Sequence, residues 1–114
     1  MMPANARRGE IEAELDGRPF RLCLTLGALA ELEAAFAVGD LGALVERFRS
    51  GRLSASDMTR IIGAGLRGAE AVVTDAEVAA MRCAGGAAGF AEIVADLLAA
   101  TFGTAKKETP ATNP

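Results

Sequence analysis

The sequence contains no histidine, and this absence removes the side chain that most often acts as a catalytic base. Without an imidazole, neither a Ser–His nor a Cys–His nucleophile can be assembled. The glycine-rich strings GAGLRG and CAGGAAG also lack the Gly-Lys-Ser/Thr ending that a phosphate-binding loop requires. The sequence therefore predicts a protein that is not an enzyme.

Cysteine is scarce as well, because Cys23 and Cys83 are the only two. Two distant cysteines fall short of the about four ligands of a structural zinc site, so we expect neither a bound metal nor any other cofactor. A single disulfide between them remains open. Reduced thiols that pack inside the domain are the simpler interpretation.

Long apolar runs are missing too. None approaches the ~20 residues needed to cross a bilayer, and the first residues, MMPANARRGE, lack the apolar segment of a signal peptide. We therefore expect a soluble, cytoplasmic protein that does not enter membranes.

The net charge of −3 argues against general nucleic-acid binding, which needs clustered cations. With no tryptophan or tyrosine, the core must come from aliphatic side chains, alanine and phenylalanine.

The first recognisable element is a β-hairpin around Asp16 and Gly17, two residues that tolerate the positive φ of a type I′ turn. Before the turn, apolar residues alternate with Glu10, Glu12 and Glu14, as in a half-buried strand. The turn predicts the strand pairs Leu15–Arg18, Ala13–Phe20, Ile11–Leu22 and Glu12–Arg21. The apolar side chains then share one face, and an opposite-charge pair lies on the other.

About five helical segments follow, each marked by a capping residue or an apolar stripe. The first should run from an N-cap at Thr25 to about residue 36, with Gly39 as the left-handed residue after it. The other predicted N-terminal signals are Asp40 and two capping boxes, Ser54 with Asp57 and Thr74 with Glu77. The short fourth helix should reach about residue 81 or 82, and the last should end at Gly103.

Two of these helices carry a further expectation about packing. The second helix is predicted to turn a stripe toward the core, consisting of Leu41, Leu44, Val45 and Phe48. In the third, Gly63 and Gly65 weaken the helix by about 1 kcal/mol each relative to alanine. They should therefore serve either close helix contact or helix termination.

The predicted fold is α+β, with an N-terminal β-hairpin followed by about five α-helices, and it is mostly helical. We expect a flexible leader over residues 1–8, a single domain over 9–103, and a disordered tail over 104–114, which is polar and contains proline. A lone hairpin is marginal in water. Its apolar face must therefore pack on the helices, or its edge must pair with another chain.

The strands offer a poor surface for self-association. Pro19 lacks an N–H donor, and Glu10, Glu12 and Glu14 would repel a second copy. Helix surfaces rich in alanine and glycine favour association instead, and a partly open apolar surface there would suit a homo-oligomer or an apolar helical client. Our predicted protein-binding residues are Arg49, Arg52, Leu53 and Met58.

A local excess of arginine leaves one further interpretation open. Residues 41–68 contain five arginines against one glutamate and one aspartate. A helix-turn-helix that binds nucleic acid would use such cations, but helix-end arginines that face water explain them as well. Nucleic acid is therefore not the expected partner.

The order of these features resembles the small tail assembly chaperones of phages and gene transfer agents. The likeness includes TLGALAELE at residues 25–33, directly after a strand with Asp-Gly, SGRLS at 50–54 and AGLRG at 64–68. TDAEVAAM and a final helix rich in alanine and leucine complete it. The resemblance covers roughly residues 9–103 and includes no catalytic motif.

The resemblance implies a role in tail morphogenesis in the cytoplasm of a bacterial host. Such proteins are thought to keep the long, aggregation-prone tape-measure protein soluble while tail-tube subunits assemble. The expected partners are therefore the tape-measure protein or the tail-tube protein, together with further copies of the chain. An alternative is a structural tail-tube or tail-associated subunit of the particle, and a weaker one is a nucleic-acid-binding helical regulator.

Overall fold

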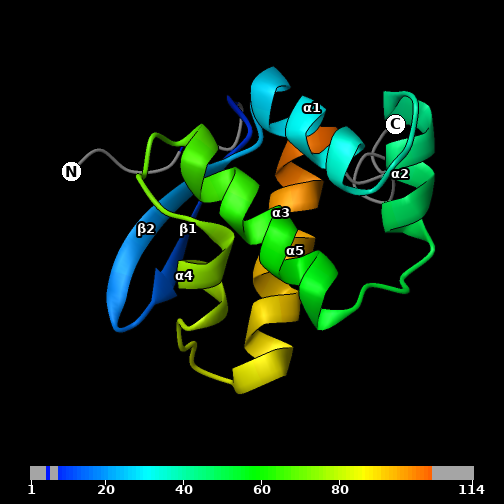
Figure 1. The fold of residues 1–114 in the computed structure, drawn as a ribbon. Helices are drawn as coiled ribbons and strands as arrows, with labels where there is room; N and C mark the ends of the chain where they lie inside the picture. Colours follow the sequence, from blue (N-terminus) through cyan, green and yellow to red (C-terminus); the bar gives the residue numbers. More distant parts are fainter. Residues whose placement is uncertain (1–4, 6–7, 104–114) are drawn as a thin grey trace, which may run out of the picture.

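The computed structural model describes residue 5 and residues 8–103 (Figure 1). Within them, an antiparallel hairpin of β1 (Glu10–Leu15) and β2 (Arg18–Cys23) lies beside five helices. The helices are α1 (Leu26–Ala35), α2 (Leu41–Arg49), α3 (Ala55–Gly68), α4 (Asp75–Ala79) and α5 (Gly86–Phe102). The predicted α+β, mostly helical architecture is confirmed. The tail predicted at 104–114, and the leader apart from residues 5 and 8, lie outside the described residues.

The hairpin has the predicted register, with Ile11 opposite Leu22 and Ala13 opposite Phe20. The turn residues Asp16 and Gly17 have φ values of 55° and 73°, positive as a type I′ turn requires. β2 contacts α3, and β1 contacts α5. The apolar face of the hairpin therefore packs on the helices, which is one of the two solutions that a marginal hairpin allows.

The tip of the hairpin is also hydrogen-bonded to the connection between α4 and α5. The Asp16 N–H donates to the Arg82 carbonyl at 2.8 Å, and the Arg82 N–H donates to Asp16 Oδ1 at 2.8 Å. Asp16 thus forms the turn and also joins the α4–α5 connection through both its backbone N–H and its side chain.

Helix α3 runs through the centre of the domain (Figure 1), and its residues 61–66 are all buried. A Cβ placed on Gly65 would lie 2.7 Å from Leu97 Cδ2 and 3.3 Å from Leu22 Cβ. Gly68 similarly lies against the Cys23 carbonyl. Of the two roles predicted for Gly63 and Gly65, close contact is the observed one, because α3 continues past both.

The predicted N-caps are confirmed for all four helices that have one. The side chains of Thr25, Asp40, Ser54 and Thr74 each accept a backbone N–H three residues ahead, and both capping boxes are complete. Gly103, at φ 80°, ends α5 as predicted. The short helix α4 stops at Ala79, earlier than the predicted residue 81 or 82.

The prediction of Gly39 as the left-handed residue after α1 is wrong. That residue is Ala37, at φ 56°, and the Val38 N–H closes the turn by donating to the Glu33 carbonyl at 3.0 Å. The earlier ending brings the ring of Phe36 to 5.8 Å from that of Phe48. A tertiary contact thus overrides the local preference for glycine.

The predicted core stripe of α2 is correct only in part. Leu44 and Phe48 are buried and Val45 is half-buried, but Leu41 is 40% exposed. Leu41 is the first residue of α2, and the helix packs through its later turns.

Cys23 and Cys83 are free thiols, half-buried and not inside the core.

Candidate protein-binding groove

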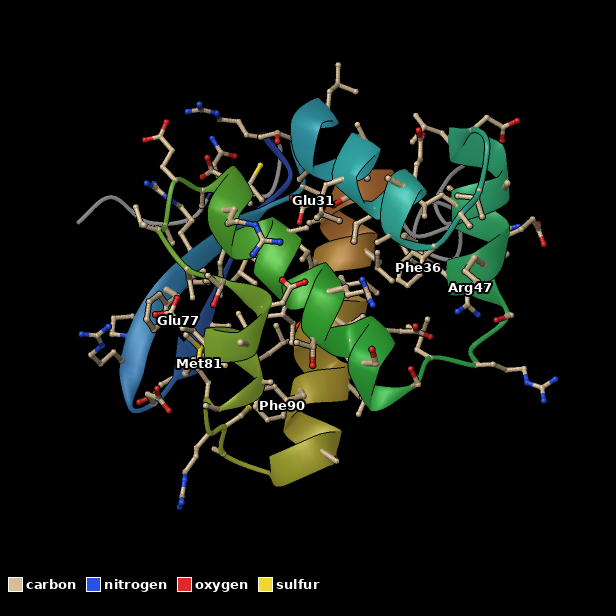
Figure 2. The ribbon with its side chains drawn as sticks, viewed as in Figure 1. Glu31, Phe36, Arg47, Glu77, Met81 and Phe90 are labelled. Carbon is tan, nitrogen blue, oxygen red and sulfur yellow. The ribbon has the colours of Figure 1, made fainter. Side chains whose placement is uncertain are left out.

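Helices α3, α4 and α5 enclose an apolar groove with a volume of about 170 Å³. Its lining residues are Ala55, Met58, Thr59, Ile62, Val78, Ala79, Ala87 and Phe90. None of them is charged, and the Thr59 hydroxyl donates to the Ala55 carbonyl at 2.8 Å. Ile62 and Val78 are almost fully buried, whereas Met58 and Phe90 are half-buried. Figure 2 shows Phe90 between α4 and α5.

The size of the groove restricts what it can hold. Sites for small molecules and cofactors usually enclose about 300–1,000 Å³ and include a few convergent polar groups. This groove is smaller and offers no free polar side chain among its lining residues. It suits one or two apolar side chains of another protein.

One wall of the groove is α4, which has only five residues. So short a helix is not stable alone, and its position depends on the contacts around it. At its start, the Glu77 N–H donates to Thr74 Oγ1 at 3.1 Å, and the Thr74 N–H donates to Glu77 Oε1 at 2.8 Å. Val78 anchors the helix in the core, with 3% of its surface exposed.

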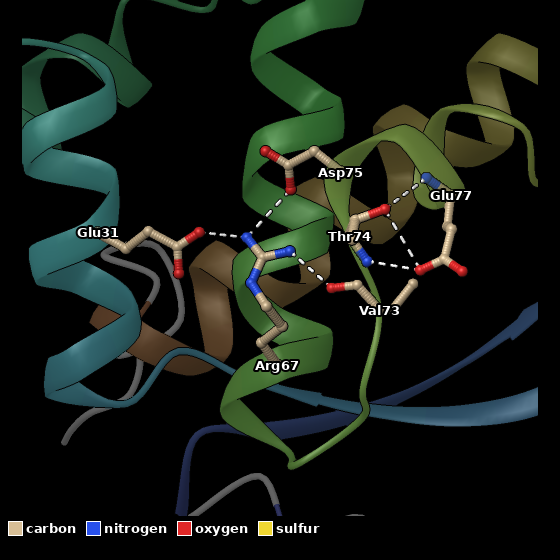
Figure 3. A network of polar contacts seen from close by, with 6 residues as sticks. All are labelled: Glu31, Arg67, Val73, Thr74, Asp75 and Glu77. Carbon is tan, nitrogen blue, oxygen red and sulfur yellow. Dashed lines mark hydrogen bonds and ion pairs between the residues drawn. The ribbon is translucent and has the colours of Figure 1, made fainter.

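Arg67 holds α4 and its preceding loop against α3 and α1 (Figure 3). Its Nη1 donates to the Val73 carbonyl at 3.0 Å, and its Nη2 forms ion pairs with Asp75, at 3.0 Å, and with Glu31. A Cβ on Gly63 would fall on the carboxylate of Asp75. Glycine at position 63 therefore leaves room for the ion pair that positions the groove wall.

The pKa values of Arg67 and Cys23 are both shifted by burial and by charged neighbours. Burial lowers the pKa of Arg67, but hydrogen bonds to Glu31 and Asp75 outweigh it, so the pKa is raised overall. The guanidinium accordingly stays charged and acts as neither an acid nor a base near neutral pH. Burial, helped by the charge of Glu10, raises the pKa of the Cys23 thiol, although Arg8 and Arg21 oppose the shift. A raised pKa makes this thiol a poor nucleophile at neutral pH.

Metal sites and membrane spans are both absent from the part of the chain that the structure describes. Within residues 5 and 8–103, no group of three or more acidic or cysteine side chains could hold a metal ion. No helix in the same residues is long and apolar enough to cross a membrane.

Of the four residues predicted to bind protein, one lies in the groove and three lie at the turn before α3. Met58 lines the groove. Leu53 is half-buried and packs against the core, while Arg49 and Arg52 are exposed at the α2–α3 turn. The groove residues of α4 and α5, Phe90 among them, were not among the predicted binding residues. No periodicity within one helix could have revealed a groove built from three.

Comparison with known proteins identifies the family. The model of the family described as "Phage tail tube protein, GTA-gp10" matches residues 8–104, which include every helix and strand described above. No curated protein and no solved structure matches the chain. The resemblance seen in the sequence is therefore confirmed, and the chain belongs to the GTA-gp10 family of phage tail proteins, a family of the tail-assembly-chaperone type.

Proposed function

We propose that the protein is a tail assembly chaperone that binds an apolar helical segment of the tape-measure protein in the α3–α4–α5 groove. Family membership suggests that its partners are tail components, and proteins of this type are typically non-enzymatic. The observation that carries the proposal is the groove itself, which is uncharged and has Met58 and Phe90 half-buried in its lining.

The chemistry of the groove suits a reversible contact with a helix. Alanine at positions 55, 79 and 87 would let a partner backbone come close, and the flexible thioether of Met58 can adapt to different side chains. Burying one large aliphatic side chain contributes about 1.5–3 kcal/mol. One or two such anchors would give weak binding, as a chaperone that must release its client requires.

A structural tail-tube subunit is the second candidate, and the description of the family as a tail tube protein favours it. Permanent assemblies usually bury more than about 2,000 Å² in interfaces with apolar cores. In the described residues, the exposed large hydrophobic side chains are scattered over three helices and a loop: Leu26, Leu41, Val72 and Phe102. This distribution supports a transient binder over a permanent subunit.

The two candidates differ in where the protein is found. A chaperone should copurify with the tape-measure protein before assembly and be absent from purified particles. Stoichiometric amounts in finished tails would instead establish a structural subunit.

We also propose that Arg49, Arg52 and Leu53 extend the binding surface beyond Met58 and that the chain self-associates there. Light scattering on the wild type and on Met58→Glu tests this. The wild type should form oligomers, and the variant should shift toward monomer while its circular dichroism stays unchanged. A strictly monomeric wild type at high concentration would contradict self-association without affecting the binding of a client.

A further inference from the structure

Helix α2 is attached to the domain by few contacts. Among the described helices it packs mainly on α1, and only Leu44 and Phe48 of its residues are buried. By contrast, α3 contacts β2, α1, α4 and α5. Segments with few buried apolar contacts open at a lower free-energy cost than the central elements of a domain.

Besides the buried Leu44, α2 makes aromatic and charged contacts through its last turn. The ring of Phe48 lies edge-on to that of Phe36 at 5.8 Å and 6.4 Å from that of Phe102. The guanidinium of Arg47 lies 5.2 Å from the centre of the Phe36 ring, and its Nη2 donates to Asp57 Oδ2 at 3.1 Å. Figure 2 shows Phe36 at the end of α1 that faces α2.

Both connections of α2 contain a residue in the left-handed region. Ala37, before the helix, has φ 56°, which is strained for alanine, and Gly51, after it, has φ 73°. Movement of α2 away from the domain would allow Ala37 to leave this conformation. The strain at Ala37 therefore favours a hinge in the connection between α1 and α2.

We propose that α2 is a detachable helix, which opens as a unit while the hairpin, α1, α3 and α5 stay folded. Its release would expose more of the rings of Phe36 and Phe102 and leave the buried carboxylate of Asp57 without its cation. The occupant that fits this surface is a cationic amphipathic helix of a partner, with two apolar residues four positions apart, as Leu44 and Phe48 are. Only the identity of this occupant as a tail component rests on the proposed function.

Hydrogen exchange on the full chain, without a partner, tests the detachment directly. The amides of α2 should exchange through a local opening whose free energy hardly changes at low denaturant concentration. Their exchange should be at least about 100-fold faster than that of the amides in the second half of α3. Arg47→Ala removes the ion pair and the cation–π contact, and it should speed α2 exchange about tenfold while leaving α3 unchanged. Glu46→Gln, which removes an exposed charge from the same helix outside the proposed binding surface, is the matched control and should change neither.

A second variant keeps the test decisive if Arg47→Ala destabilises the whole domain. Phe48→Leu preserves most of the apolar volume but removes the ring contacts, so it too should speed exchange in α2 alone. Detachment is contradicted if α2 and α3 exchange at one rate with one denaturant dependence, or if neither variant accelerates α2. Either outcome would contradict detachment of α2 but not client binding in the groove. Conversely, failure to capture a tail component would contradict the proposed function but not detachment of α2.

Discussion

The close contact at Gly65 predicts that a single added methyl group will destabilise the domain. In Gly65→Ala, the new Cβ would lie 2.7 Å from Leu97 Cδ2 and 3.3 Å from Leu22 Cβ and Cδ2. Leu22 and Leu97 are both 0% exposed, so neither can move without displacing other core side chains.

Two opposing effects determine the size of the change. Alanine is the better helix former in a helix interior by about 1 kcal/mol. Overpacking of a well-packed core costs about 1–3 kcal/mol. The packing cost should win, because the contact is well below van der Waals distance, and the net loss should be about 1 kcal/mol. For a domain of this size, that loss lowers Tm by about 4–8 °C.

Gly27→Ala provides the matched control. Gly27 is also helical, but the nearest atom to its added Cβ is Thr25 Oγ1 at 3.9 Å, which is ordinary contact. This variant should therefore gain up to about 1 kcal/mol from helix propensity alone. Thermal and urea unfolding of both variants would measure the difference. If Gly65→Ala proves as stable as Gly27→Ala, the reasoning about packing at α3 is wrong.

Two further predictions concern strained backbone and the half-buried thiol. Two residues that close helices adopt a left-handed conformation, Ala37 at φ 56° and Glu70 at φ 73°. Because glycine adopts this conformation without strain, Ala37→Gly and Glu70→Gly should each stabilise the domain by about 0.5–1 kcal/mol. A lower Tm for both variants would contradict this. In a Cys83→Ala background, Cys23 should be alkylated slowly at neutral pH, because its pKa is raised. Its alkylation rate should still increase with pH above the point at which the rate for free cysteine reaches a plateau. A plateau at a lower pH than that of free cysteine would refute the direction of the shift.

The parts of the fold that the sequence predicted depend on neighbouring residues. The hairpin combines a two-residue turn at Asp16 and Gly17 with strict alternation, and a period of two leaves one register that buries the apolar face. The N-caps were equally readable, because a capping box such as Ser54 with Asp57 spans only three residues.

The parts that escaped prediction depend on residues far apart in the chain. The left-handed alanine after α1 follows from a ring contact with α2, against the local signal at Gly39. The network of Arg67 joins three helices and a loop, and none of its members is marked by spacing. The groove likewise needs α4 and α5 to be placed beside Met58, which only tertiary packing determines.

Capture of the tape-measure protein by groove variants tests the proposed function most directly. Purified wild type, Met58→Glu and Leu26→Glu would be compared for binding to the tape-measure protein after circular dichroism has shown that each is folded. Leu26 is 78% exposed on α1 and does not line the groove, so its variant controls for an added charge. We predict that Met58→Glu loses at least about tenfold in affinity, the equivalent of 1.4 kcal/mol, while Leu26→Glu binds like the wild type. Equal binding by all three proteins would show that the groove is not the site.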